Sequence, residues 1–127
     1  MTQKFTLKKY ERLKSQKQIE KLFTSAKSKF KYPLKLLYIS ESSSDNNERL
    51  KFSVSVPKKK VKSAVTRNQI KRLIRESYRL NKKIISASSL TQLSLMFIYI
   101  EKELVDYSVI EKSIIHLLKQ LENEVAD

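Results

Sequence analysis

Three segments of the chain have the hydrophobic patterns of β-strands. Residues 50–56 alternate between apolar and polar positions, which predicts a strand with one buried face. The apolar positions are Leu50, Phe52, Val54 and Val56, and the polar ones are Lys51, Ser53 and Ser55. Residues 34–39 follow Pro33 as a second candidate, and we expect these two strands to pair as a hairpin across the polar segment 41–49. Residues 94–100 are nearly all apolar, as in a strand buried on both faces.

Helix signals lie before, between and after these strands. Ser15 with Gln18, Thr66 with Gln69, and Ser108 with Glu111 each have the spacing of a capping box. The first predicts a short helix over residues 15–26, and the second a helix that begins near residues 64–67 and ends at Asn81. The third opens a last helix with an apolar stripe: Val109, Ile110, Ile114, Leu117, Leu118 and Leu121. The order helix, strand, strand, helix, strand, helix predicts an α+β sheet with helices packed on it.

The central helix has two chemically different sides. At about 100° per residue, Arg67, Lys71, Arg75 and Arg79 form one ridge, flanked by Asn68 and Arg72. The opposite side gathers Ile70, Leu73, Ile74, Ser77 and Leu80. One side therefore suits a hydrophobic core and the other suits anions.

Charge is concentrated around this helix. The chain carries a formal +14, and residues 57–83 hold eleven Lys or Arg against one acid, Glu76. Four of the six Arg lie here, although the chain otherwise prefers Lys. A guanidinium holds phosphate through two hydrogen bonds. A merely solvated helix usually mixes signs at i,i+4, whereas like charges repeat here at a cost in stability. The pattern favours binding to nucleic-acid phosphates.

Composition limits the alternatives. With 127 residues, the chain is expected to form one domain over residues 1–127, with a basic arm over residues 1–14 that we expect to be extended and partly mobile. Cys and Gly are absent, which excludes disulfides, thiolate metal sites and Gly-rich phosphate loops. No signal peptide or membrane span is evident, so we expect a cytoplasmic protein. Residues 100–127 have a net charge of −4, so RNA should avoid the last helix.

The residues for protein-borne catalysis are missing. His116 is the only His, and we interpret it as a partly buried structural residue. No nucleophile–His set and no carboxylate cluster with metal-ligand spacing can be assembled. Phe23 either packs in the core or offers a platform on which a base stacks. The polar face of residues 50–56 either meets solvent or floors a nucleic-acid groove.

Residues 64–76, AVTRNQIKRLIRE, resemble the signature A-x-x-R-N-x-x-K-R-x-x-R of the bacterial ribonuclease P protein component. The preceding Ser55-Val56-Pro57-Lys58-Lys59 resembles the strand end of that family, and the resemblance extends from residue 11 through the last helix. It implies a small α+β domain with a mixed sheet of about four strands, three helices and a left-handed βαβ crossover, a fold type shared with a ribosomal protein domain. One short strand could then lie in the arm around Arg12.

The resemblance also implies a function. Such a protein is a subunit of an endoribonuclease, a ribonucleoprotein that removes the 5′ leader from precursor tRNA. One protein joins the catalytic RNA, and Mg²⁺ is held mainly by the RNA subunit and substrate, with none bound by the isolated protein. Catalysis belongs to the RNA, so no catalytic protein residue is expected.

The resemblance assigns residues to two surfaces. The RNA-binding residues would be Arg67, Asn68, Lys71, Arg72, Arg75, Arg79, Lys58, Lys59, Lys60 and Arg12. The cleft for the single-stranded leader would include Phe23, Ile19, Tyr38 and Lys51. Ile19 stands where many members have an aromatic residue, which weakens a stacking role there.

Other hypotheses for the function of the chain predict different properties. A structural or ribosome-associated RNA-binding protein would bind RNA without supporting leader cleavage. A DNA-binding protein would need a recognition helix with base-reading side chains, for which only Asn68 and Gln69 are suitable. A membrane-surface helix would carry interfacial Trp or Phe, which the apolar side of this helix lacks.

Overall fold

The computed structural model describes residues 26–42, 50–85 and 91–125. The strands are β1 (Lys27–Lys31), β2 (Leu34–Ser42), β3 (Leu50–Ser55) and β4 (Thr91–Tyr99). The helices are α2 (Ala64–Asn81), the 3₁₀ turn η3 (Lys82–Ile84) and α3 (Tyr107–Val125). The helix predicted over residues 15–26 and the basic arm lie outside the described residues, apart from Ala26. The α+β class predicted from the sequence is confirmed.

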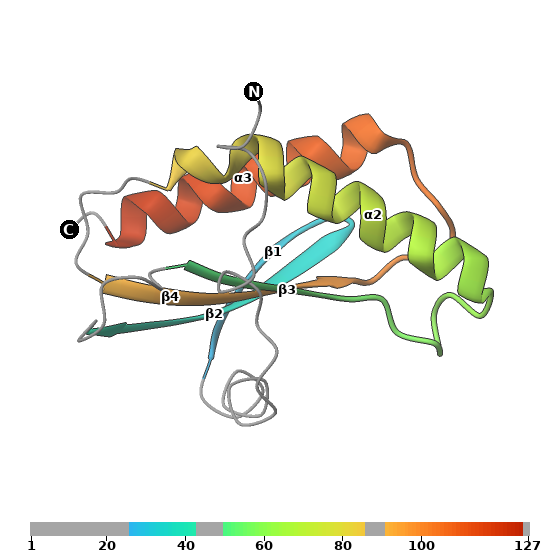
Figure 1. Ribbon diagram of the computed structural model, residues 1–127, viewed down its shortest axis with the longest axis horizontal. Helices are drawn as coiled ribbons and strands as arrows, with labels where there is room; N and C mark the ends of the chain where they lie inside the picture. Colours follow the sequence, from blue (N-terminus) through green and yellow to red (C-terminus); the bar gives the residue numbers. More distant parts are fainter. Residues whose placement is uncertain (1–25, 43–49, 86–90, 126–127) are drawn as a thin grey trace.

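The four strands form one mixed sheet in the order β1-β2-β4-β3. Strand β4 is antiparallel to β2 and parallel to β3, and α2 connects β3 to β4 as a βαβ crossover. Helices α2 and α3 lie together on one face of the sheet (Figure 1). The predicted hairpin between residues 34–39 and 50–56 is therefore wrong, because β4 lies between these strands. Alternation identifies a buried face but not the neighbouring strand.

The short strand is β1, at one edge of the sheet. It pairs antiparallel with β2 across the turn at Tyr32 and Pro33, whose peptide bond is cis. The short strand that the structure describes is therefore at residues 27–31, and the expected strand around Arg12 lies outside the described residues. Four of the five residues of β1 are exposed and only Phe30 is hydrophobic, so hydrophobic patterning carried no signal for this edge strand.

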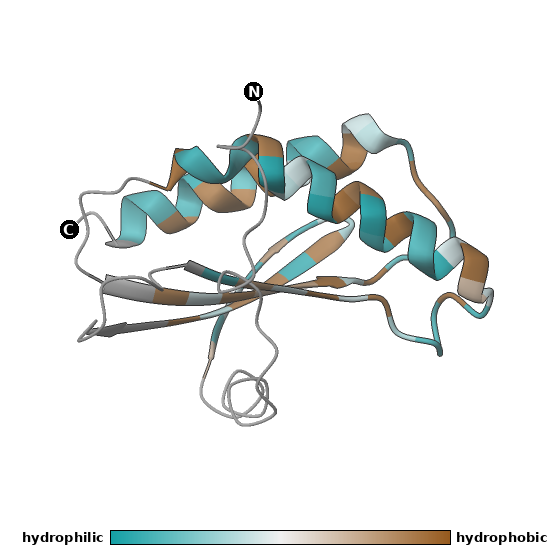
Figure 2. Cartoon of the chain, viewed as in Figure 1, coloured by the Kyte–Doolittle hydropathy of each residue, from teal (hydrophilic) through white to brown (hydrophobic). Residues whose placement is uncertain are grey.

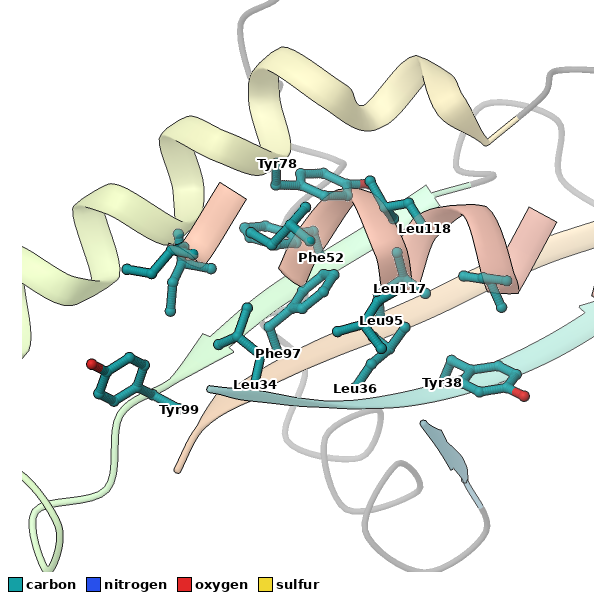
Figure 3. Close-up of a cluster of buried hydrophobic side chains, with 14 of the residues drawn as sticks. Leu34, Leu36, Tyr38, Phe52, Tyr78, Leu95, Phe97, Tyr99, Leu117 and Leu118 are labelled. Atoms are coloured by element: carbon teal, nitrogen blue, oxygen red, sulfur yellow. The ribbon is translucent and has the colours of Figure 1, made fainter. Parts of the chain in front are cut away.

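The core lies between the sheet and the two helices (Figure 3). Phe52 of β3 stacks on Tyr78 of α2 with ring centroids 4.1 Å apart, and both rings contact Phe97 of β4 at wider angles. Hydrophobic and hydrophilic positions alternate along both helices (Figure 2). The predicted inward set of α2 holds for Ile70, Ile74 and Ser77, which are all buried, and Leu73 is partly buried against the core; the buried set also includes Tyr78. Leu80, which was predicted to face inward, is 39% exposed.

Strand β4 is buried on both faces, as predicted. Leu95 and Phe97 belong to the core beneath the helices. Met96 points the other way and packs with Leu37 of β2, next to Ile39 and Ile98. We call this side of the sheet the Met96 face; α2 and α3 lie on the other side.

The helix ends differ in detail from the predicted capping boxes. Ser63, not Thr66, caps α2, because its Oγ accepts a hydrogen bond of 3.2 Å from the Thr66 amide. Helix α2 ends at Asn81, as predicted, but Lys82 and not Asn81 occupies its C-cap position, and η3 follows directly. The Asn81 side chain instead donates to the Ser77 carbonyl and to Glu111 of α3. Helix α3 begins at Tyr107, one residue before the predicted Ser108.

Candidate nucleic-acid interface

The basic ridge predicted on α2 is not uniformly exposed. Arg67 is half-buried, and its Nη1 donates to the carbonyls of Val61 and Lys62 at 2.9 and 3.0 Å. This guanidinium therefore fastens the segment before the helix to the first turn of α2. Part of its hydrogen-bonding capacity is used within the protein and is not free for a phosphate.

Arg79, at the other end of the ridge, is paired with an acid. Its Nη2 lies 2.5 Å from Oε2 of Glu76, and its Nε donates to the other oxygen at 3.2 Å. The hydrogen bond to Glu76 raises the pKa of Arg79 above its usual value. The bidentate pair offsets the charge of Arg79, so the C-terminal end of the ridge is a weaker anion site than its sequence predicts.

The cationic side chains in the middle of α2 are not engaged by other described residues. Arg72 and Arg75 are exposed and Lys71 is half-buried. Within the described residues none of these three side chains has a hydrogen bond or an ion pair. A guanidinium that is exposed and unpaired keeps all five N–H donors for a ligand. The structure therefore shifts the strongest candidate phosphate sites from the ends of the ridge to its centre.

The three lysines before α2 lie on an ordered turn. The amides of Lys60 and Val61 both donate to the Pro57 carbonyl, at 3.1 and 3.0 Å. Val61 is buried in the core and anchors this turn, while Lys58, Lys59 and Lys60 are all exposed. A buried anchor thus holds three ammonium groups next to the first turn of α2 in the sequence.

The outermost stripe of α2 contains Val65, which sequence reasoning missed, and Gln69, which it considered only as a cap partner and as a reader of DNA bases. Val65, Asn68, Gln69 and Arg72 follow one another at helical i, i+3, i+4 and i+7 spacing and are all exposed. They line a recess with a volume of about 420 Å³. Val65 and Gln69 carry no charge, so a search for basic residues passes over them. This stripe lies on the side of the helix opposite the buried Ile70 and Ile74. The position of these two apolar residues in the sequence would therefore have identified it as the most exposed side.

Of the predicted leader-cleft residues, the structure describes Tyr38 and Lys51, and it places these two on opposite faces of the sheet. Tyr38 belongs to the core on the helix side of the sheet and is 3% exposed. Lys51 pairs with Ser94, which in turn pairs with Ile39 on the Met96 face. Since cross-strand partners share a face, Lys51 and Tyr38 lie on opposite sides of the sheet. Phe23 and Ile19 lie outside the described residues, as does Arg12.

Tyr38 instead belongs to a cluster that ties the end of α3 to the sheet edge. Its hydroxyl donates to Glu124 at 2.8 Å, and Lys29 of β1 lies 2.8 Å from Oε1 of the same carboxylate. The hydrogen bond from Lys29, followed by that from Tyr38, lowers the pKa of Glu124. Burial, followed by the hydrogen bond to Glu124, raises the pKa of Tyr38. This geometry gives Tyr38 a structural role.

His116 lies on the exposed side of α3, so its predicted partial burial is wrong. The apolar stripe of α3 is buried at Ile114, Leu117 and Leu118, and His116 falls on the other side of the helix. Among the described residues no three His, Cys, Asp or Glu side chains are grouped as they would be around a metal ion. None of the described helices is long and apolar enough to cross a membrane.

Comparisons with known proteins agree with this architecture. The sequence model of the Ribonuclease P family matches residues 7–122. The ribonuclease P protein component of Porphyromonas gingivalis strain W83 is 35% identical over 115 residues, covering 86% of this chain and 81% of that protein. That of Clostridium botulinum is 37% identical over 110 residues, covering 86% and 92%.

Solved structures show the same fold. The RNase P protein of Thermotoga maritima superposes with a TM-score of 0.69 at 24% identity, covering 87% of this chain and 96% of that one. The Staphylococcus aureus RNase P protein gives 0.69 at 22% identity, covering 88% and 95%. The match over residues 7–122, the curated relatives and the basic helix on a mixed four-stranded sheet lead to one conclusion: the chain belongs to the ribonuclease P protein family.

Proposed function

We propose that the exposed basic side of α2, together with the Lys58–Lys60 turn, binds the catalytic RNA of ribonuclease P. In this role the chain supports removal of the 5′ leader from precursor tRNA. The observation that carries the proposal is the pair of exposed guanidinium groups at Arg72 and Arg75, which have no protein partner among the described residues. Exposed guanidinium groups bind phosphate through charge-assisted, bidentate hydrogen bonds.

The chemistry expected of this surface is electrostatic. Lysine and arginine neutralise RNA phosphates and release condensed counterions, so affinity should fall steeply with salt. A protein that lowers the repulsion between catalytic RNA and precursor tRNA also lowers the Mg²⁺ concentration that cleavage needs. The metal would be held by RNA and substrate, and one protein would join each RNA. The cytoplasmic location remains a prediction.

For the leader we propose the Met96 face of the sheet. Lys51 points to this side, and Ser53 and Ser55 lie on the same side of β3. A lysine beside small polar side chains leaves room for an extended single strand and attracts its phosphates. Phe23 and Ile19 remain predictions for this surface. Tyr38 is left out of the proposal because its ring is buried on the other side.

Reconstitution tests the proposal. The purified protein is mixed with the ribonuclease P RNA of the same organism and a precursor tRNA at low Mg²⁺, and leader release is followed. Cleavage that requires both components supports the function. The same assay with Arg72→Ala plus Arg75→Ala should need more Mg²⁺, while a Lys119→Ala control on α3 should behave as the unchanged protein. Salt-dependent RNA binding with no effect on cleavage would favour a structural RNA-binding protein instead.

A further inference from the structure

The recess over the first two turns of α2 has a composition that phosphate binding does not explain. Its described lining consists of Val65, Asn68, Gln69 and Arg72. Val65 is 77% exposed, more than any other large hydrophobic residue that the structure describes. An apolar side chain and two neutral amides contribute little to a surface that only has to neutralise charge. These residues suit a ligand with both an apolar face and polar edges.

The polar groups of the recess are available to such a ligand. Within the described residues the side chains of Asn68, Gln69 and Arg72 form no hydrogen bond or ion pair, and all three are exposed. Each amide offers two donors and a carbonyl acceptor. The guanidinium of Arg72 offers a flat face for stacking as well as five donors. Donors, acceptors, an apolar contact and a stacking plane therefore occur on four residues of one helical stripe.

From this arrangement we propose that Val65, Asn68, Gln69 and Arg72 form a seat for one unpaired nucleobase of the bound RNA. The base would lie against Val65 and the Arg72 plane while Asn68 and Gln69 hydrogen-bond to its edge. Amide side chains pair with base edges in this manner. The inference rests on the proposed RNA-binding function and deepens it, because α2 would recognise a base in addition to phosphates.

The geometry favours an unpaired base over a base in a duplex. The major groove of an A-form helix is too narrow and deep for side chains to read. Bases in loops, bulges and ends can be turned outward and stacked on planar side chains. The surrounding Arg75 and the preceding lysine turn would hold the flanking phosphates. A protein partner would have to match the same positive surroundings with acidic residues, and this outcome is included in the test.

Binding as a function of salt separates base contacts from phosphate contacts. Gln69→Ala and Val65→Ser should each weaken binding to the ribonuclease P RNA roughly fivefold or more, with the slope of log affinity against log salt unchanged. The matched control Arg75→Ala should reduce that slope by about one unit, as expected for one lost phosphate contact. Circular dichroism and thermal unfolding should be unchanged for these exposed positions.

Chemical probing locates the base. Dimethyl sulfate modifies the pairing edge of unpaired adenine or cytosine. The wild-type protein should protect one such base from modification. The Gln69→Leu variant should leave that base reactive while it still protects the other bases that the wild-type protein protects. Removing that base from the RNA should make wild-type and Gln69→Leu proteins bind equally. Unchanged affinity and protection in both Gln69→Leu and Val65→Ser would overturn the inference, and the recess would then be a protein contact or a passive surface. Failure of the wild-type protein to bind the RNA at all would instead overturn the proposed function.

Discussion

Helices α2 and α3 pack side by side on one face of the sheet and both contribute to one core, yet their charges are used in opposite ways. Helix α2 carries five Lys or Arg against one acid, and α3 carries two Lys against three acids. The acids of α3 make contacts within the protein: for example, Glu111 accepts from Asn81, and Glu124 accepts from Tyr38. The central cations of α2, Arg72 and Arg75, make no such contact with described residues.

This difference shows that the net charge of a segment does not predict the charge that it presents. The acids of α3 suggest an outer surface that repels RNA, but its exposed positions include Lys112, His116 and Lys119. The ridge of α2 suggests four equivalent cations, but Arg67 and Arg79 are occupied at either end. An interface must therefore be identified from charges that have no partner inside the fold.

The largest expected effect tests whether the inner faces of the two helices are equivalent. Ile74→Ala in α2 and Leu117→Ala in α3 should each lower the free energy of unfolding by about 2–5 kcal/mol, because both side chains are fully buried and each truncation leaves a cavity. Urea unfolding followed by circular dichroism measures the loss. If only one variant were destabilised by this amount, the two helices would not share one core.

The next largest effect compares RNA binding by the outer faces of the two helices. Arg72→Ala and Arg75→Ala should each weaken RNA binding by about 1–3 kcal/mol without loss of stability, as for a charge-assisted contact. Lys119→Ala on α3 removes the same charge and should leave the affinity unchanged. Filter binding at several salt concentrations provides the measurement. Equal losses at Lys119 and Arg75 would mean that the protein attracts RNA only through its total charge.

Arg67 is a poor choice for such a test. Its guanidinium holds the Val61 and Lys62 carbonyls, so Arg67→Ala should also lower stability, and a loss of RNA affinity would have two causes. Arg67→Lys does not remove this ambiguity, because an ammonium cannot reproduce the planar fork.

A smaller effect concerns how α2 begins. Ser63→Ala should destabilise the protein by about 1 kcal/mol, because the Thr66 amide loses its acceptor. Thr66→Ala, at the cap predicted from the sequence, should cost clearly less. Thermal unfolding of the two variants measures which substitution costs more stability. A larger loss for Thr66→Ala than for Ser63→Ala would support the capping box predicted at Thr66.

The smallest effect concerns the carboxylate that ties α3 to the sheet. The pKa of Glu124 is lower in the folded protein than in the unfolded chain. Its contribution to the free energy of unfolding is therefore fully present above the ordinary carboxyl pKa, and it is lost as the pH falls through the lowered pKa. Glu124→Gln should therefore reduce stability at pH 7 by at most about 1 kcal/mol, since the group is partly exposed. At a pH well below this lowered pKa, where the carboxyl of Glu124 is protonated, the variant and the wild-type protein should unfold alike.

In urea titrations at the two pH values, a difference that persists in acid would show that Glu124 acts through packing and not through its charge. Lys119→Ala on the exposed side of α3 provides the control, because no contact to another described residue is lost there.

Much of this protein is determined by its sequence alone. The alternation in β3, the apolar run in β4 and the periodicity of α2 and α3 predicted their elements, because side-chain burial repeats with the period of the local backbone. The motif from Ala64 to Arg75 identified the family, and the count of Arg around α2 identified the anion-binding side. These signals are local, so they can be read without knowing what packs on what.

Only the tertiary structure decided the relations between distant segments. It inserted β4 between β2 and β3, placed Tyr38 and Lys51 on opposite faces of the sheet, and moved the first cap of α2 to Ser63. It also showed which cations of α2 are already engaged and which remain for a ligand. Strand neighbours and ion pairs depend on contacts between residues far apart in the chain, and hydrophobic periodicity carries no information about them.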